Sequence, residues 1–355
     1  MYCITFYSFK GGVGRTLALV NVGARLARMG RKVLLVDFDL EAPGLETFDR
    51  LRPLESHPGM VEYVTEYMRT KCVPNIRDYV YSAGSIGKKR GQLWVMPAGR
   101  RDQMYQSALA KIDWLRLYHD SDGFLLFEDT KAQWEQAFAP DYVLIDSRTG
   151  HTDVEGICTR QLPDAVVVLF FPNEQNLVGL KDVCRRIRGE RTSGLEKHIR
   201  LHFVMSNVPD LDDEDRILRH RRWMFERDLG YDKLDAIIHR YESVLLFNQA
   251  IFVLDKPKSR LAREYKRLVK SLIMYNWADR VGARLFLDHR RISLSSDPTE
   301  MLEWANLERD ALDQITRNFP DDSELMQRVK ERRDRETRIV KRVGQAVPES
   351  PQPHG

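Results

Sequence analysis

The fold is decided by the stretch Lys10-Gly11-Gly12-Val13-Gly14-Arg15-Thr16, which joins a β-rich run to an amphipathic helical pattern. Residues 4–9 (ITFYSF) precede the glycines, and residues 17–29 carry apolar side chains at helical spacing. Residues 33–36 (VLLV) then form an apolar run typical of a strand that is buried on both faces of a parallel sheet. The sequence therefore predicts a βαβ unit that opens on a glycine loop, and an α/β fold.

The glycine loop has the composition and the context of a phosphate-binding loop. Glycines let the backbone approach phosphate oxygens closely, and the following helix adds the positive end of its dipole. Thr16 places a hydroxyl where such loops bind Mg²⁺. A lone glycine loop is a weak signal, but Lys10 before it and the acids after it make the prediction of a nucleotide site stronger.

Further buried strands are predicted by the apolar runs at 93–96, 142–145, 165–171 and 201–205. Helical patterns lie between them at 129–138, 177–188 and 213–228. This alternation predicts a doubly wound, mostly parallel sheet whose ligands bind beyond the carboxyl ends of the strands. We expect residues 46–135 to be an enlarged, irregular insertion.

The chain of 355 residues is 43% hydrophobic and 30% charged, as in soluble globular proteins, and it has no apolar run of membrane-spanning length. Its four cysteines form no CxxC pair, which argues against a disulfide framework or a zinc site and favours the cytoplasm. The net charge is only +4, but residues 185–291 carry 24 Lys and Arg against 16 Asp and Glu. This asymmetry weakly indicates an anionic partner, with a solvated basic surface as the alternative.

The pattern changes after about residue 275. Asp297-Pro298 and Asp321-Asp322-Ser323 have the composition of helix starts. We therefore predict a main domain over 1–275, an α-helical extension over 276–345, and a disordered tail over 346–355 that is rich in proline.

The glycine loop resembles the deviant Walker A motif, KGGxGK[ST], of the ParA/MinD family of P-loop ATPases, in the SIMIBI class. The resemblance implies ATP and Mg²⁺ as cofactors, and a lysine, Lys10, that reaches across a homodimer to the partner's ATP. It implies nucleotide contacts from Lys10, Gly11, Gly12, Val13, Gly14, Arg15, Thr16 and Leu17.

Later motifs extend this resemblance to about residue 275. Asp39 matches the residue that positions the attacking water, and Asp37 before it matches the strand-end acid of the metal shell. Residues 142–146 (YVLID) resemble a Walker B strand, with Asp146 holding Mg²⁺ through water, and Gly150 matches the switch glycine. Asn207 matches an asparagine that contacts adenine, although an ordinary turn residue remains equally open.

Two residues depart from the family pattern. Arg15 replaces the usual lysine, and its planar, forked guanidinium is not equivalent to an ammonium. Leu17 replaces a second hydroxyl residue. Both departures put the rate of hydrolysis in question more than nucleotide binding. The motifs KGGVGRT, DLEAPG and DSRTG resemble those of one bacterial branch of this family. Arg148, in the last of these motifs, is either a switch residue or an ion-pair partner.

A basic helical face is predicted near the end of the main domain, because residues 256–270 hold seven basic residues and one acid. ParA-type relatives bind DNA non-specifically in this part of the chain, and a solvated face is the alternative. The candidate DNA contacts are Arg260, Arg263, Lys266, Arg267 and Lys270.

The function that we favour is a slow, cytoplasmic ATPase that dimerises on ATP and acts as a molecular switch for a partner protein, encoded nearby, or for DNA. The alternative, motivated by Arg15, is a nucleotide sensor that does not hydrolyse ATP, as a regulatory subunit of a bacterial conflict or signalling system. A bacterial tyrosine kinase is disfavoured because the last tyrosine is Tyr275, which leaves no tyrosine-rich tail. A terminal membrane helix is not expected.

Overall fold

The computed structural model describes residues 1–87, 91–150, 156–189, 198–210, 214–242, 250–289 and 298–346. The chain divides into two compact units, Met1–Val269 and Lys270–Gly355. All but the first residue of the predicted tail over 346–355 lies outside the described residues. Among the described residues, none of the helices combines the length and the apolar character needed to cross a membrane.

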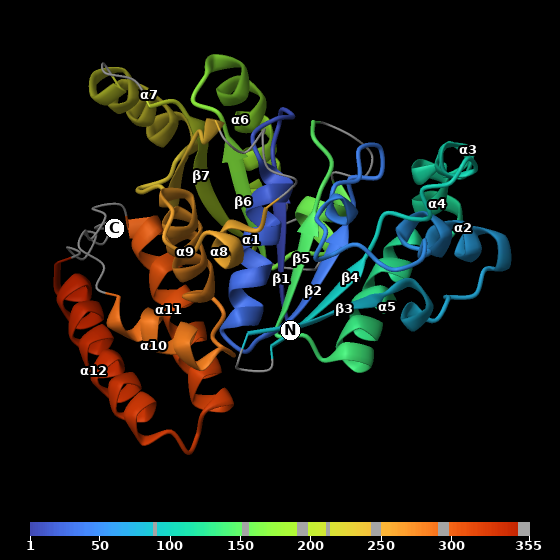
Figure 1. Ribbon diagram of the computed structural model, residues 1–355. Coiled ribbons are helices and arrows are strands. Elements are labelled where there is room, and N and C mark those ends of the chain that lie inside the picture. The colour runs from blue at the N-terminus through green and yellow to red at the C-terminus, as the bar shows by residue number, and fades with distance from the viewer. Residues whose placement is uncertain are drawn as a thin grey trace, which may run out of the picture. The chain divides into compact units, whose positions relative to one another are not determined.

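A sheet of eight strands forms the centre of the first unit, in the order β3-β4-β2-β5-β1-β6-β7-β8 (Figure 1). All neighbouring strands are parallel except β3 and β4, which pair antiparallel at one edge. The strands are β1 (Tyr2–Tyr7), β2 (Lys32–Asp37), β3 (Tyr81–Ile86), β4 (Gly91–Met96), β5 (Tyr142–Asp146), β6 (Ala165–Phe170), β7 (Arg200–Val208) and β8 (Ala236–His239). This arrangement confirms the doubly wound, mostly parallel sheet.

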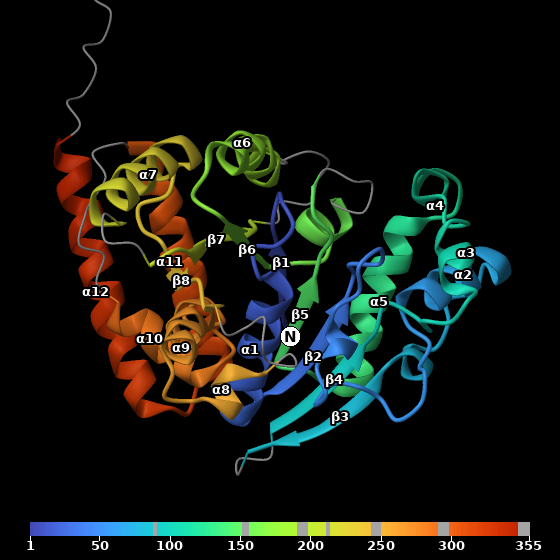
Figure 2. The same cartoon turned by 45° about the horizontal axis from the view of Figure 1, so that its top comes forward.

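Helices cover the sheet and connect its strands. Those that begin in the first unit are α1 (Arg15–Arg28), α2 (Met60–Thr70), α3 (Tyr105–Leu109), α4 (Trp114–Asp120), α5 (Gly123–Phe138), α6 (Glu174–Gly189), α7 (Glu214–Leu229), α8 (Phe252–Asp255) and α9 (Arg260–Ile273). Figure 2 shows α6 and α7 beside β6 and β7, and α2 to α5 beside the opposite end of the sheet.

The central strands are buried on both faces, which explains their uninterrupted apolar sequences. Leu35 of β2 and Leu144 of β5 lie against Gly23 of α1, where a Cβ would come within 2.7 Å of Leu35. The alternate residue Val143 belongs instead to a hydrophobic cluster that includes Phe127 of α5. Successive residues of each strand thus pack against helices on opposite faces of the sheet.

The segment over 46–135 contains the strand predicted at 93–96, which is part of β4, and it is more regular than expected, because it also supplies β3 and helices that begin at Met60, Tyr105, Trp114 and Gly123. Strand β3 has no buried apolar run, since its residues are only half-buried or exposed. Helices α3 and α4 have five and seven residues, too few to establish a helical period in the sequence.

The second unit is helical, as predicted, and contains α10 (Arg280–Asp288), α11 (Pro298–Asn318) and α12 (Ser323–Ala346). Its own core is formed by apolar residues of all three helices, including Phe286, Ile315 and Leu325. The predicted start of α12 is confirmed, because Asp322 accepts a hydrogen bond from the backbone N–H of Leu325 at 3.2 Å.

Replacing Gly59 tests how tightly the 46–135 segment packs on the sheet. A Cβ at this position would lie 2.0 Å from the backbone oxygen of Pro97, directly after β4. We expect Gly59→Ala to lower the free energy of unfolding by about 1–3 kcal/mol, because neither backbone segment can yield without local rearrangement. Denaturant unfolding measures this loss. Gly189→Ala is the control, since a Cβ there meets nothing within 4 Å, and equal stability of the two variants would contradict the packing.

Candidate functional site

The glycine loop connects β1 to α1, and its backbone is open. Gly12 and Gly14 have φ angles of +77° and +80°, which favour glycine over any other residue. A Cβ added at Gly11, Gly12 or Gly14 would meet nothing within 4 Å. Between them, Val13 is buried, and its carbonyl oxygen accepts a hydrogen bond from the Ser206 hydroxyl at 2.7 Å. The loop is thus anchored at Val13 while its glycine backbone stays accessible to a ligand.

Two carboxylates meet beside this loop, because the register of β2 and β5 places Asp37 opposite Asp146. Both side chains are buried. Asp37 accepts hydrogen bonds from the backbone N–H groups of Gly44 at 3.0 Å and Leu45 at 3.1 Å. Burial, and then the nearby Asp146 carboxylate, raise the pKa of Asp37. The two strand ends therefore concentrate negative charge in a site with little water.

Arg15 lies among these acids and is itself only 6% exposed. Its Nε donates to Asp146 at 2.6 Å, and one terminal nitrogen forms an ion pair with Asp39. The other terminal nitrogen is 3.4 Å from the Ser8 hydroxyl. Burial alone would lower the pKa of Arg15, but Asp146 and Asp39 outweigh it, and the pKa is raised. Burial raises the pKa of Asp39, and Arg15 opposes that shift.

The donor set beside Arg15 fits Mg²⁺. The Thr16 hydroxyl donates to Asp146 at 2.6 Å, so a hydroxyl and the carboxylates of Asp146 and Asp37 lie together at the strand ends. Mg²⁺ prefers oxygen ligands and takes one or two carboxylates together with phosphate and water oxygens. In the part of the chain that the structure describes, no group of three or more His, Cys, Asp or Glu could hold a metal ion alone.

Two loops that flank the site are joined by an ion pair. Arg148 bonds Glu41 at 2.6 Å, which links the segment after Asp39 to the segment before Gly150. Arg148 is therefore an ion-pair partner in the structure. Gly150 has a φ angle of +76°, and its carbonyl oxygen lies 3.4 Å from the Tyr7 hydroxyl that donates to it.

Three other predicted residues lie around the loop. Lys10 is exposed, with its Nζ 5.4 Å from the centroid of the Phe9 ring. The backbone oxygen of Leu17 accepts from the Asn21 amide at 2.8 Å. Asn207 lies within β7, with a φ angle of +55°, rather than after the strand. Its neighbour Ser206 bonds Val13, so this part of β7 adjoins the glycine loop.

The basic residues of α9 differ in their surroundings. Arg260 pairs with Asp210 at 2.7 Å and with Glu264 at 3.1 Å. The Lys266 ammonium donates to the Pro257 oxygen at 2.6 Å. Arg263 and Arg267 are exposed, and Lys270 begins the second unit.

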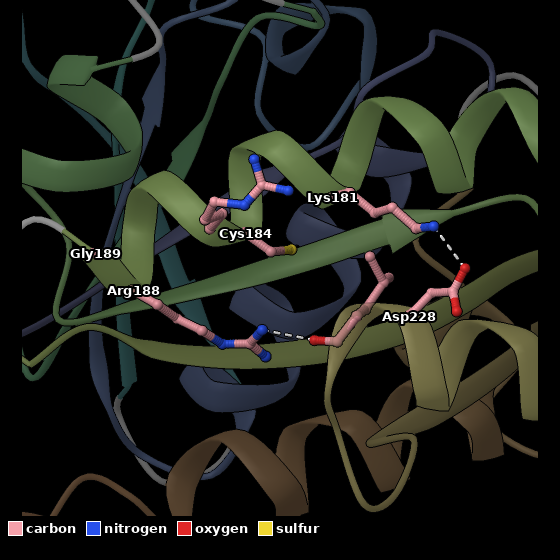
Figure 3. A pocket seen from close by; sticks show the side chains of 7 residues that line it. Lys181, Cys184, Arg188, Gly189 and Asp228 are labelled. Carbon is pink, nitrogen blue, oxygen red and sulfur yellow. Dashed lines mark hydrogen bonds and ion pairs between the residues drawn. The ribbon is translucent and has the colours of Figure 1, made fainter.

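A hollow lies between α6 and α7 (Figure 3), where contacts join the two helices. Lys181 pairs with Asp228 at 2.6 Å, and Arg188 donates to the backbone oxygen of Leu229 at 2.6 Å. These contacts hold the two helices together. Two of the side chains that line the hollow, Lys181 and Arg188, thus bond across it to α7.

Sequence reasoning missed several residues of the site. Ser8, Glu41 and Ser206 each touch a predicted site residue, yet each is a common polar residue beside a motif. Glu41 belongs to the stretch DLEAPG, but nothing in the sequence shows that it pairs with Arg148. Only the positions of Glu41 and Arg148 shortly after the neighbouring strands β2 and β5 could have suggested this pair.

A phosphate-binding loop before α1, two strand-end acids and a mostly parallel sheet define the fold of a P-loop nucleoside triphosphatase. Comparison with known proteins supports a ParA/MinD-like member of this class. A protein-family model described as an AAA domain matches residues 1–49.

One curated relative matches a short stretch of the chain, and another matches most of it. The septum site-determining protein MinD of Synechocystis sp. is 50% identical over 52 residues, which are 15% of this chain and 18% of the relative. The same-named protein of Bacillus subtilis is 23% identical over 277 residues, which cover 76% of this chain and 88% of the relative.

Solved structures share the fold over about three quarters of the chain. MinD of Pyrococcus horikoshii OT3, complexed with Mg-ADP, has a TM-score of 0.56 at 18% identity and covers 76% of this chain and 95% of its own. A complex of a Cyanothece McdA variant with ATP has a TM-score of 0.57 at 16% identity, with coverages of 77% and 96%. The Aquifex aeolicus MinC:MinD complex has a TM-score of 0.52 at 20% identity, with coverages of 77% and 96%.

Arg15→Met tests whether the guanidinium neutralises the buried acids. We expect a loss of about 3–5 kcal/mol in the free energy of unfolding near neutral pH, because Asp39 and Asp146 would remain buried without their cation. Burial already raises the pKa values of Asp37 and Asp39, so the folded state takes up protons more readily than the unfolded state. Stability therefore falls as pH rises from the ordinary aspartate range to the raised values.

The loss should consequently be smaller at about pH 5 than near neutral pH. Urea unfolding of the wild type and Arg15→Met at both pH values measures it. A deficit that is the same at both pH values would show that Arg15 acts by packing rather than by charge.

Proposed function

We propose that the chain binds ATP with Mg²⁺, dimerises in the ATP-bound state, hydrolyses ATP slowly and thereby switches the binding of a partner protein. The observation that carries this proposal is the meeting of Arg15, Thr16, Asp37, Asp39 and Asp146 beside an open glycine loop. The structural relatives that contain Mg-ADP or ATP support the choice of nucleotide, and the MinC:MinD complex supports a protein partner.

Arg15 has a different role in each state of the proposed cycle. In the structure it pairs with Asp39 and Asp146. When a triphosphate binds, the guanidinium exchanges the Asp39 carboxylate for phosphate oxygens, with which it forms bidentate hydrogen bonds. Asp39 is then released and orients the attacking water. Phosphoryl transfer depends on such positioning and charge neutralisation rather than on a covalent step.

Thr16 and Asp146 would hold the metal ion, with Asp37 in its outer shell. Bound Mg²⁺ neutralises charge on the phosphate oxygens. Asp146 already accepts a hydrogen bond from the Thr16 hydroxyl at 2.6 Å, which keeps the two side chains together. Val13 and the flanking glycines would present backbone N–H groups to the phosphates, and Asn207 on β7 would face the adenine.

Lys10 and Gly150 would convert the bound nucleotide into a change at the surface. Lys10 is exposed, so it can reach the nucleotide of a second copy. Gly150 would detect the terminal phosphate through its N–H. Because Arg148 is tied to Glu41 at 2.6 Å, movement of either loop pulls on the other, and a partner protein can recognise the combined change.

A nucleotide sensor without turnover is the second candidate function, and the Arg15–Asp39 ion pair favours it. If the guanidinium keeps Asp39 after the nucleotide binds, no carboxylate remains to orient water. The protein would then bind ATP and dimerise without releasing phosphate, as a regulatory subunit of a larger system.

The test is to measure the oligomeric state and phosphate release with no nucleotide, with ADP and with Mg-ATP. We expect Lys10→Ala to abolish the ATP-dependent dimer, since its ammonium would no longer reach the partner's phosphates. Asp39→Ala should trap the dimer and lower phosphate release by about 10²-fold or more, because the water-orienting carboxylate is lost. Light scattering and a phosphate assay on the same samples provide both readouts.

Lys32→Ala is the matched control, because Lys32 is exposed at the amino end of β2, away from the strand ends that hold the site. A wild-type dimer without phosphate release would favour the sensor, and Arg15→Lys should then restore turnover. A wild type that ignores ATP would refute both functions.

Non-specific DNA is the partner that we propose for the basic face of α9. Burial, and then Arg25 and Arg28 of α1, lower the pKa of Lys266, so cations from two helices gather here.

We expect the double variant Arg263→Glu, Arg267→Glu to weaken DNA binding. It should also reduce the slope of log affinity against log salt concentration by about one for each phosphate contact removed. Arg116→Glu, an exposed charge reversal on α4, is the control in a filter-binding titration, and equal salt slopes would exclude this face.

A further inference from the structure

Phe9 lies between β1 and the glycine loop, and its ring packs against helix α6. A Cβ built on Gly179 of α6 would lie 2.2, 2.3 and 2.4 Å from the ring atoms Cε1, Cδ1 and Cζ of Phe9. The ring therefore packs directly on the helix backbone, in space that only a glycine leaves free. Glycine is otherwise a poor residue for the interior of a helix, so this contact explains its presence in α6.

A second neighbour of the ring is Lys10. Its Nζ lies 5.4 Å from the centroid of the Phe9 ring, which is within the range of a cation–π contact. Lys10 is exposed, and long exposed lysines normally sample many rotamers. A ring fixed by α6 restricts these rotamers.

We propose that Phe9 and Gly179 together form a positioning device for Lys10 that orders its ammonium before two copies of the chain meet. The inference rests on the proposed ATP-dependent dimer and names what prepares its lysine. Helix α6 holds the ring through Gly179, the ring holds the ammonium, and the ammonium binds the partner's phosphates. Ordering the side chain in advance lowers the entropy cost of association.

Phe9→Leu and Gly179→Ala test the device from its two sides. Leucine keeps an apolar side chain but lacks the π face, and alanine at 179 displaces the ring. A cation–π contact at an exposed site changes an equilibrium constant about 2- to 5-fold, and the dimer contains two such contacts, so each variant should raise the dimer dissociation constant about 4- to 25-fold. The probe is a non-hydrolysable ATP analogue with Mg²⁺, and sedimentation measures the dissociation constant.

A device that acts only on Lys10 should leave the monomer unchanged. We therefore expect each variant to bind a fluorescent ATP analogue with an affinity within about twofold of wild type, when the protein concentration is kept below the dimer dissociation constant. Because Gly179 acts through Phe9, the double variant should dimerise no more weakly than the weaker single variant. Gly189→Ala in the same helix, where a Cβ meets nothing within 4 Å, should dimerise like wild type.

The two proposals fail differently in this experiment. If Lys10→Ala abolishes the dimer while Phe9→Leu and Gly179→Ala dimerise like wild type, the positioning device is refuted and the proposed function stands. If Lys10→Ala itself dimerises normally, the lysine has no role at the interface, and both proposals fall. Effects of the two single variants that add fully in the double variant would also refute the device, because α6 and the ring would then act separately.

Discussion

The site depends on one buried cation among three acids. Arg15 is bonded to Asp146 at 2.6 Å and paired with Asp39, and the pKa of Asp37 is raised by its burial and then by Asp146. Without a cation this arrangement would leave several buried carboxylates uncompensated, at a cost of several kcal/mol for each ion. The structure tolerates the concentration of negative charge because one guanidinium can bind two carboxylates at once.

The rest of the first unit positions this ion-pair network. The parallel register of β2 and β5 brings Asp37 and Asp146 to the same edge of the sheet, and the glycine loop turns Arg15 back toward them at the start of α1. Backbone N–H groups of Gly44 and Leu45 fix Asp37. A ligand that draws Arg15 away from Asp39 would therefore disturb both flanking loops, since Glu41 and Arg148 connect them.

The sequence predicted the fold well where a pattern reflects burial on both faces of a sheet, as in residues 33–36 and 142–145. Within residues 46–135 it predicted the strand at 93–96 but missed β3, an edge strand without a buried apolar run, and α3 and α4, which are too short to show a period. The glycine loop was recognised from its residues and from its place between a strand and a helix, and the strand-end acids were recognised from the resemblance to the ParA/MinD family.

The contacts among the site residues were not predicted. Nothing in the spacing shows that Arg15 pairs with Asp39 or that Gly179 makes room for Phe9, since both depend on tertiary packing. The most direct measurement is a crystal structure of the wild type with Mg²⁺ and a non-hydrolysable ATP analogue. Our account predicts that the Arg15 guanidinium lies on phosphate oxygens and that Asp39 is released. Arg15 still paired with Asp39 beside a bound nucleotide, or a glycine loop that does not bind the analogue, would contradict it.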